Sequence, residues 1–339
     1  MNVALTPPRQ RKPARKPAGE PTSDAPVAPA SGRPRRGLGF RLRQNWPLTL
    51  FLVPGTLVLL TFHYVPLGGN VIAFKDYLPF LGIGGSEWVG WDNFRILFNG
   101  DPAFLNALKN TLVITLVQTI FVFPAPIALA LLLNSLVSER LKRVVQTIVY
   151  LPHFLSWVIV VAIFQQFLGG SGMLNNWLRS NGNDALSIIG NPDAFISLIT
   201  SQVMWKDTGW ATILFLAVLS TIPNELYEAA SMDGASRTRQ IWHITLPGMR
   251  GIIILLLILK IGDSLTVGFE QILLQQAAVG LHTSEVLDTY VYNNGVIGGN
   301  WGVSAAVGLA KGVVSVLLVL LANRIAHIFG EDGVYRREH

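Results

Sequence analysis

Six long apolar runs are the feature that most constrains the fold of this 339-residue chain. A helix needs about 20 mainly apolar residues to cross a bilayer. The candidate spans are Pro47–Val65, Thr111–Leu133, Val145–Leu168, Phe195–Ser220, Pro247–Phe269 and Val303–Ile328. Apolar residues make up 50% of the chain and charged residues only 14%, which is unusual for a soluble protein of this length. The sequence therefore predicts an all-α, polytopic membrane protein with six transmembrane helices.

Two of the six runs are interrupted by polar residues or proline. Pro152 and His153 fall inside the third run, and Lys206 and Asp207 fall inside the fourth. Prolines within membrane spans are tolerated and often mark kinks, so we expect a kink at Pro124 and near Pro152.

The first 45 residues differ in composition from the rest. Ten Lys and Arg residues lie between Arg9 and Arg43, and the stretch is rich in Pro and Ala without apolar periodicity. The leader is too long for an ordinary signal peptide, and many spans follow the first one. We therefore predict a disordered basic tail over residues 1–45, a six-span domain over residues 46–330 and a short tail over residues 331–339.

Loop charges predict the orientation in the membrane, because Lys and Arg concentrate on the cytoplasmic side. The basic residues outside the N-terminal tail that carry this argument are Arg140, Lys142, Arg143, Arg237, Arg239, Arg250, Arg324, Arg336 and Arg337. The loop between the fifth and sixth spans has no Lys or Arg. We therefore expect a cell-membrane protein with both termini and the second and fourth loops in the cytoplasm.

The fourth loop, from Thr221 to Arg250, has a distinctive pattern. Its first half favours a helix, with Pro223 at an early position and Glu and Ala residues after it. Gly234 then breaks or caps that helix, and Pro247 opens the next span. The loop is predicted to form a short helix, a bend and a second helical piece.

This loop resembles the coupling motif of binding-protein-dependent ABC importer permeases, which reads E-A-A, three residues, G, nine residues, I-x-L-P. The matching residues are Glu228, Ala229, Ala230, Gly234, Ile244, Leu246 and Pro247, and Asp233 lies beside them. The resemblance implies a cytoplasmic coupling helix that docks in a groove of a separate ATPase subunit. An interfacial amphipathic helix with these letters is the alternative, but a chance match at seven positions is rare.

Other stretches resemble permeases that import carbohydrates, especially oligosaccharides that include uronate-containing fragments of plant or algal polysaccharide. They are Phe62–Leu67, Ile72–Tyr77, Trp88–Phe94, Leu151–Trp157, Gly268–Gln271 and Asp288–Tyr292. The resemblance covers about residues 46–330 and implies four kinds of partner. These are a second permease, an ATPase dimer, an external solute-binding protein and a sugar substrate.

Several kinds of chemistry are not expected of this chain. It has no Cys and no G-x-x-x-x-G-K-[ST] motif, so we expect ATP and Mg²⁺ on the partner ATPase and no cofactor here. His63, His153 and His243 are scattered without metal-ligand spacing, so we predict no metal site. The net charge of +6 is concentrated in the basic tail, which favours contact with membrane lipid and not with nucleic acid.

Polar residues inside the spans are candidates for the substrate pathway, because ionisable groups in a membrane are costly and often functional. The candidates are Trp205, Trp210, Asp263 and Glu270. Two alternatives stay open. In the first, Lys260 and Asp263 share a helix face and neutralise each other. In the second, the tryptophans serve only as interfacial anchors.

Two functions compete with the importer, and a third alternative lies within the importer class. A secondary transporter would not need the E-A-A pattern and often shows internal repeats, of which there is no clear sign. A membrane enzyme would need a catalytic constellation, and we predict no catalytic residue. An amino-acid or phosphate permease is disfavoured by the carbohydrate-like stretches.

Overall fold

The computed structural model describes residues 46–136, 138–328, 330 and 333. The chain divides into two units, Met1–Phe62 and His63–His339. The predicted basic tail and nearly all of the predicted C-terminal tail lie outside the described residues. In the first unit, helix α2 (Trp46–Leu59) contains Pro54 and leads into the π-helix η1 (Leu60–Tyr64), which crosses into the second unit.

The second unit begins with short elements around a small antiparallel hairpin. They are α3 (Val65–Leu67), η2 (Gly68–Phe74), β1 (Lys75–Asp76), α4 (Gly82–Gly85), β2 (Glu87–Trp88) and η3 (Asp92–Leu97). Lys75 pairs with Trp88 in the hairpin, and the Phe74 ring stacks on Trp88 at 5.7 Å.

The rest of the second unit is helical. Its first part contains α5 (Pro102–Phe121), α6 (Pro124–Asn134), α7 (Glu139–Tyr150), the 3-10 helix η4 (Leu151–Phe154), α8 (Trp157–Leu168), α9 (Met173–Ser180) and α10 (Pro192–Leu219). Its second part contains α11 (Asn224–Met232), α12 (Arg237–Gln240), the π-helix η5 (Ile241–Thr245), α13 (Leu246–Gly262), α14 (Phe269–Val279), α15 (Leu281–Ser284), α16 (Leu287–Val291), the π-helix η6 (Tyr292–Ile297) and α17 (Trp301–Ile328).

Membrane-length helices dominate the described residues. Five segments are long and apolar enough to cross a membrane, namely Leu50–Phe74, Pro102–Asn134, Trp157–Ser180, Arg237–Gly262 and Trp301–Ile328. A sixth candidate is α10 together with α11, which bend by 74° at their junction. The prediction of an all-α polytopic membrane fold is therefore confirmed, with five to six spans by length and composition.

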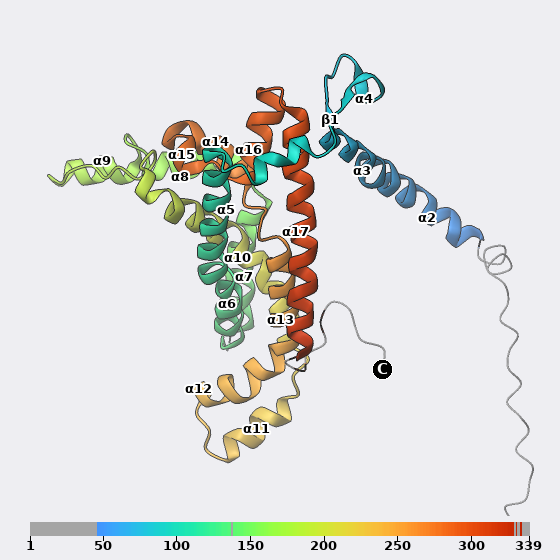
Figure 1. Ribbon diagram of the computed structural model, residues 1–339. Coiled ribbons are helices and arrows are strands. Elements are labelled where there is room, and N and C mark those ends of the chain that lie inside the picture. Colours follow the sequence, from blue (N-terminus) through green and yellow to red (C-terminus); the bar gives the residue numbers. More distant parts are fainter. Residues whose placement is uncertain (1–45, 137, 329, 331–332, 334–339) are drawn as a thin grey trace, which may run out of the picture. The chain divides into compact units, whose positions relative to one another are not determined.

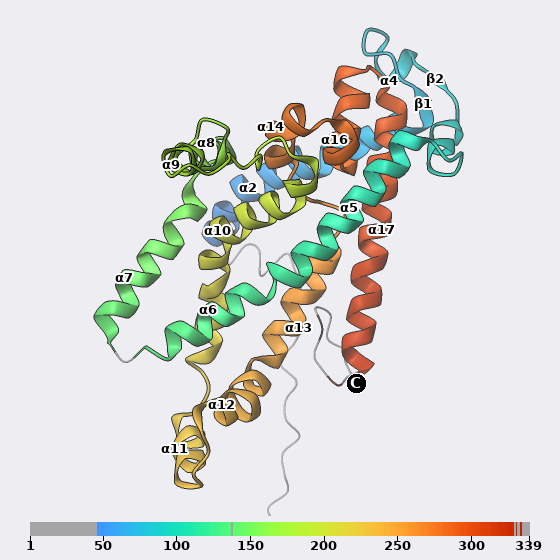
Figure 2. The ribbon, with the colours of Figure 1, turned by 90° about the vertical axis from the view of Figure 1, so that its left-hand side faces the viewer.

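Helix α10 is central to the second unit and packs against α5, α6, α7, α13 and α14 (Figures 1 and 2). Phe195 and Ile199 contribute to a buried cluster with α5 and α14, while Phe215 and Leu219 contribute to another with α6 and α13. In both views α11 and α12 project from one end of the unit, and α14 and α16 lie toward the other end. The C-terminal end of α17 lies toward the end that carries α12.

The proline kinks occur where the sequence predicts them. Helix α5 ends at Phe121, and Pro124 starts α6 after a two-residue turn, because proline has no N–H to continue the hydrogen-bond ladder. Pro152 lies in η4, between α7 and α8. The second predicted span is therefore kinked, and the third is broken.

Two predicted spans need correction. The third, Val145–Leu168, is not one continuous helix, because Leu155 and Ser156 are extended between η4 and α8. The fifth, Pro247–Phe269, ends at Gly262 and starts earlier, at Arg237. Glu270 therefore lies in the first turn of α14, outside the fifth span where the sequence prediction placed it.

Candidate functional site

The E-A-A loop (residues 221–250) folds as the predicted helix, bend and second helix. Helix α11 ends in a Schellman motif, in which Ala235 N donates to Ala230 O at 2.9 Å and Gly234 N donates to Ser231 O at 3.1 Å. Gly234 has φ +74°, a left-handed conformation that glycine adopts at little cost. Ser236 then caps α12 by accepting a hydrogen bond from Arg239 N. The bend is therefore fixed by local hydrogen bonds.

The two faces of α11 differ. On the inner side, Tyr227 Oη and Thr245 Oγ1 lie 3.1 Å apart, and Gln240 Nε2 donates to Ser231 Oγ at 3.0 Å. The outer side exposes Glu228, Ala229, Met232, Asp233 and Gly234. An ideal Cβ at Gly234 would meet no atom within 4 Å, so this side of the bend is open. Contacts within the loop therefore hold its inner face, and its outer face is exposed.

The sequence prediction placed Pro247 at the start of the fifth span, but the span starts earlier. The helix already begins at Arg237 and passes through the π-helical turn η5 before Pro247. A π-helical turn accommodates the missing proline N–H, so the chain continues as a helix from the bend into the membrane. Ile244 and Leu246, the apolar motif positions, are partly buried along this segment.

A second group of residues surrounds the break in the third span. The carbonyl groups of His153 and Leu155 leave the helical ladder there, and Lys206 Nζ of α10 donates to both, at 2.6 and 2.7 Å. Lys206 is buried, and its ammonium lies 5.5 Å from the Trp157 ring centroid. Freed carbonyl groups need partners in a membrane, and Lys206 supplies one for each.

The side chain of His153 is held by the same helix. Its Nδ1 lies 2.9 Å from Asp207 Oδ1, and its ring stacks on Trp210 with centroids 4.7 Å apart and planes 4° apart. Phe154 packs edge-on against Trp210 at 5.7 Å. We call His153, Asp207 and Trp210 the stacked array. The His153 and Asp207 side chains are about one-third exposed, at 32% and 38%.

Lys260 and Asp263 do not form the ion pair considered from the sequence. Both residues are described, and no nitrogen–oxygen distance within 4.0 Å joins them. Asp263 ends α13 as its C-terminal cap and is exposed. Lys260 of α13 lies within electrostatic reach of Asp263 and of Asp207, which is a member of the stacked array.

The four predicted pathway residues are not all brought together. Among the described residues, no hydrogen bond, ion pair or ring contact joins Trp205, Trp210, Asp263 and Glu270 to one another. Trp205 packs edge-on against Phe164 at 5.8 Å. Glu270 is exposed at the start of α14. Trp210 belongs to the stacked array, and Asp263 lies at the exposed C-terminal end of α13.

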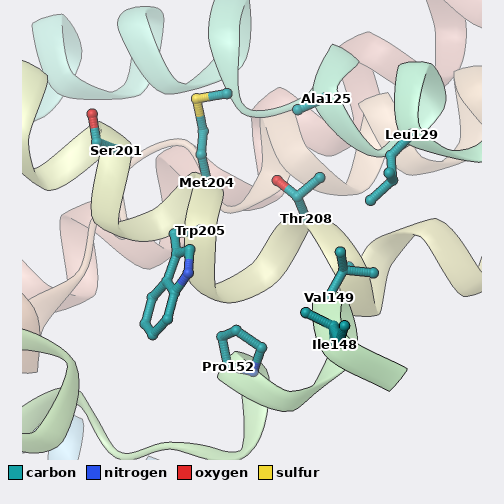
Figure 3. A pocket seen from close by; sticks show the side chains of 10 residues that line it. Ala125, Leu129, Ile148, Val149, Pro152, Ser201, Met204, Trp205 and Thr208 are labelled. Carbon is teal, nitrogen blue, oxygen red and sulfur yellow. The ribbon is translucent and has the colours of Figure 1, made fainter. Parts of the chain in front are cut away.

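Trp205 also lines a cavity of about 510 Å³ between α6, α7 and α10 (Figure 3). Figure 3 shows Ser201, Met204, Trp205 and Thr208 along α10, with residues of α6 and of the α7–η4 segment facing them. The Thr208 hydroxyl is buried without a hydrogen-bond partner. The other lining residues are Ala125, Leu129, Ile148, Val149, Pro152 and Gly209. The cavity is mainly apolar and does not contain the charged groups of the stacked array.

The sequence analysis missed the polar groups that join the helices at the end that carries α14 and α16. Gln202 of α10 exchanges side-chain hydrogen bonds with Gln275 of α14 and accepts one from Gln271 at 2.7 Å, all buried. Lys311 of α17 pairs with Asp288 of α16. Lys311 is the one charged residue in the apolar stretch 301–323, and with Asp288 in the preceding loop it is the signal that would have revealed this pair.

Glu285, which lies between α15 and α16, is buried beside polar neighbours. Burial raises the pKa of its carboxyl group, while a hydrogen bond from Asn293 acts in the opposite direction. Burial likewise raises the pKa of Tyr290 to about 12. These groups are structural supports for the segment between α14 and α17.

The fold and these two sites together define a class of protein. Partly exposed polar and charged side chains within membrane-spanning helices cannot face lipid at low cost, so they face another subunit or a water-filled path. A helical hairpin projects from one end of the same helices. This combination is that of a membrane transport subunit.

The chain belongs to the family of binding-protein-dependent transport system inner membrane components, whose family model matches residues 122–331. It is therefore a multi-pass permease subunit of an importer. This result favours the importer subunit over a secondary transporter or a membrane enzyme.

Similar proteins agree with that assignment. The chain is 47% identical over 89% of its length to the polygalacturonan/rhamnogalacturonan transport system permease protein YteP of Bacillus subtilis (strain 168), of which 94% is covered. It is 28% identical over 84% of its length to the arabinooligosaccharides transport system permease protein AraP of the same strain, of which 90% is covered.

A solved structure gives the same fold. It is a chain of a bacterial alginate ABC transporter in complex with an alginate pentasaccharide-bound periplasmic protein. The TM-score is 0.79 at 36% identity, covering 88% of this chain and 99% of that one.

Proposed function

We propose that this chain forms half of a translocation pathway for uronate-containing oligosaccharides, powered by a separate ATPase. The observation that carries the proposal is the stacked array, in which a partly exposed imidazole, carboxylate and indole lie together, with the Lys260 ammonium within electrostatic reach of Asp207. Aromatic rings stack on sugar rings, and cations bind carboxylates. The relatives support the acidic substrate, because polygalacturonan and alginate are both polymers of uronic acids.

Within this proposal, the ATPase docks on the outer face of α11. Small Ala229 permits close approach, Glu228 and Asp233 offer charges, and Met232, which is 89% exposed, offers an apolar side chain to bury. ATP and Mg²⁺ bind the ATPase dimer, whose closure moves α11 and, through the continuous helix from Arg237, the membrane segment of α13. The Schellman bend and the Tyr227–Thr245 contact make that transfer rigid.

The remaining partners follow from the family and the open surfaces. A second permease subunit covers the partly exposed side chains of the stacked array and completes the pathway. An external solute-binding protein delivers the sugar at the α14–α16 end. The chain has both termini in the cytoplasm. Support for the C-terminal side comes from α17, which ends toward the end that carries α12 (Figure 1).

A competition experiment tests the substrate class. The complete importer, reconstituted in liposomes with its binding protein and internal ATP, is given radiolabelled trigalacturonate below its KM. Unlabelled trigalacturonate at ten times the KM should lower uptake about tenfold by simple occupancy. The same concentration of neutral arabinotriose should leave the rate unchanged. Equal inhibition by both sugars would contradict an acidic substrate and would favour the neutral sugars that the name of the 28%-identical relative indicates.

A further inference from the structure

The break in the third span is held almost entirely by one helix. Lys206 donates hydrogen bonds to the carbonyl groups of His153 and Leu155. The Asp207 carboxylate contacts the His153 imidazole, and the Trp210 ring stacks on that imidazole. Gly209 lies between them and is packed against the backbone of Val149, where an added Cβ would come within 1.9 Å of the carbonyl oxygen. These α10 residues therefore bind one short segment from both its backbone and its side chain.

Lys206 is more buried than the polar side chains around it. It is 8% exposed, whereas His153 and Asp207 are about one-third exposed and Asp263 is exposed. Its ammonium is engaged by two carbonyl oxygens and the face of Trp157, which leaves it poorly placed to bind a sugar. The Lys206 ammonium therefore makes its contacts within the protein, whereas the side chains of the stacked array are partly exposed.

We propose that Lys206 is a positioning residue for transport, which fixes the backbone at His153 and Leu155 so that the stacked array keeps its geometry. This inference rests on the proposed function. His153 can meet Asp207 and lie parallel to Trp210 only while the turn between η4 and α8 keeps its path. Leu155 and Ser156 are extended, and each still makes a backbone hydrogen bond to the adjoining helix, from Leu155 N to Pro152 O and from Val160 N to Ser156 O. The carbonyl groups of His153 and Leu155 instead accept hydrogen bonds from the Lys206 ammonium.

Transport kinetics of the complete importer test the proposal, with trigalacturonate as the probe. In Lys206→Met, a side chain of similar length without donors, the KM should rise about tenfold while the maximal rate per assembled complex changes less than about twofold. Lys206→Arg should restore most of the affinity, because its guanidinium can donate to both carbonyl groups. Lys109→Met, at an exposed position on α5, is the matched control and should match the wild type.

A second measurement reads the geometry without any sugar. The chain has no native cysteine, so Phe154→Cys gives a single labelling site, at a residue that is 70% exposed. Its maleimide labelling rate should change in the Lys206→Met background and return in the Lys206→Arg background. A wild-type importer that takes up no trigalacturonate would contradict the proposed function and leave this labelling result to decide the role of Lys206.

Three results would overturn the proposal. The first is an unchanged KM and labelling rate in Lys206→Met. The second is a Lys206→Arg variant as impaired as Lys206→Met. The third is failure of both Lys206→Met and Lys206→Gln to assemble while Lys206→Arg assembles, which would assign Lys206 to folding alone.

Discussion

Replacing Gly234 with Asp is expected to abolish ATP-driven uptake while leaving membrane insertion intact. Gly234 lies at the exposed bend of the E-A-A loop with φ +74°, and nothing lies within 4 Å of its Cβ direction. The added carboxylate would therefore meet the docked ATPase and no part of this chain. A like charge or an unpaired charge in an interface costs several kcal/mol, so uptake should fall about a hundredfold or more.

Gly234→Asn is the matched control for this variant. Asn and Asp both adopt left-handed backbone conformations more readily than other side chains, so the two variants carry similar backbone strain. They differ in charge, and Asn should retain more uptake than Asp. Uptake is measured in proteoliposomes, with insertion checked by membrane fractionation. Normal transport by Gly234→Asp would contradict the docking role of this loop.

Replacing Gly209 with Val is expected to destabilise the helical core severely. An added Cβ would come within 1.9 Å of the Val149 carbonyl oxygen and 2.5 Å of its carbon, so α7 and α10 would have to separate. Overpacking typically costs about 1–3 kcal/mol, and a clash with backbone belongs at the upper end of that range or above it. The thermal unfolding midpoint of the detergent-purified chain should fall clearly, as measured by loss of soluble monomer on heating.

Gly312→Val in α17 provides the control for the same substitution. Its added Cβ meets nothing within 4 Å, and the position is exposed. This variant should keep the wild-type midpoint. Equal midpoints for the Gly209 and Gly312 variants would contradict the close α7–α10 packing described here.

Local patterns in the sequence were sufficient to predict the E-A-A loop. A helix, a glycine bend and a second helix depend on neighbouring residues, and Gly234 and Ser236 act within a few positions of themselves. The start of the fifth span was predicted at Pro247 because proline is common in the first turn of a helix. No pattern in the sequence indicates the π-helical turn before it.

The break in the third span could be suspected from Pro152, yet its support could not be derived. Lys206 reaches carbonyl groups more than 50 positions earlier in the chain, and such contacts depend on how helices pack. The Gln202–Gln275 contact and the Lys311–Asp288 pair are missed for the same reason. Hydropathy also extended the fifth span too far, since it does not distinguish a membrane helix from the apolar turn after Gly262.

The most direct test of the central claim is an affinity purification of the tagged chain from native membranes in mild detergent, with identification of the proteins that co-purify. We expect a P-loop ATPase and a second multi-span permease with the wild-type chain. With Gly234→Asp we expect the ATPase to be lost and the second permease to be retained, because Gly234 lies at the loop that docks the ATPase. Reproducible recovery of the chain by itself would contradict the account of an ATP-driven importer built from separate subunits.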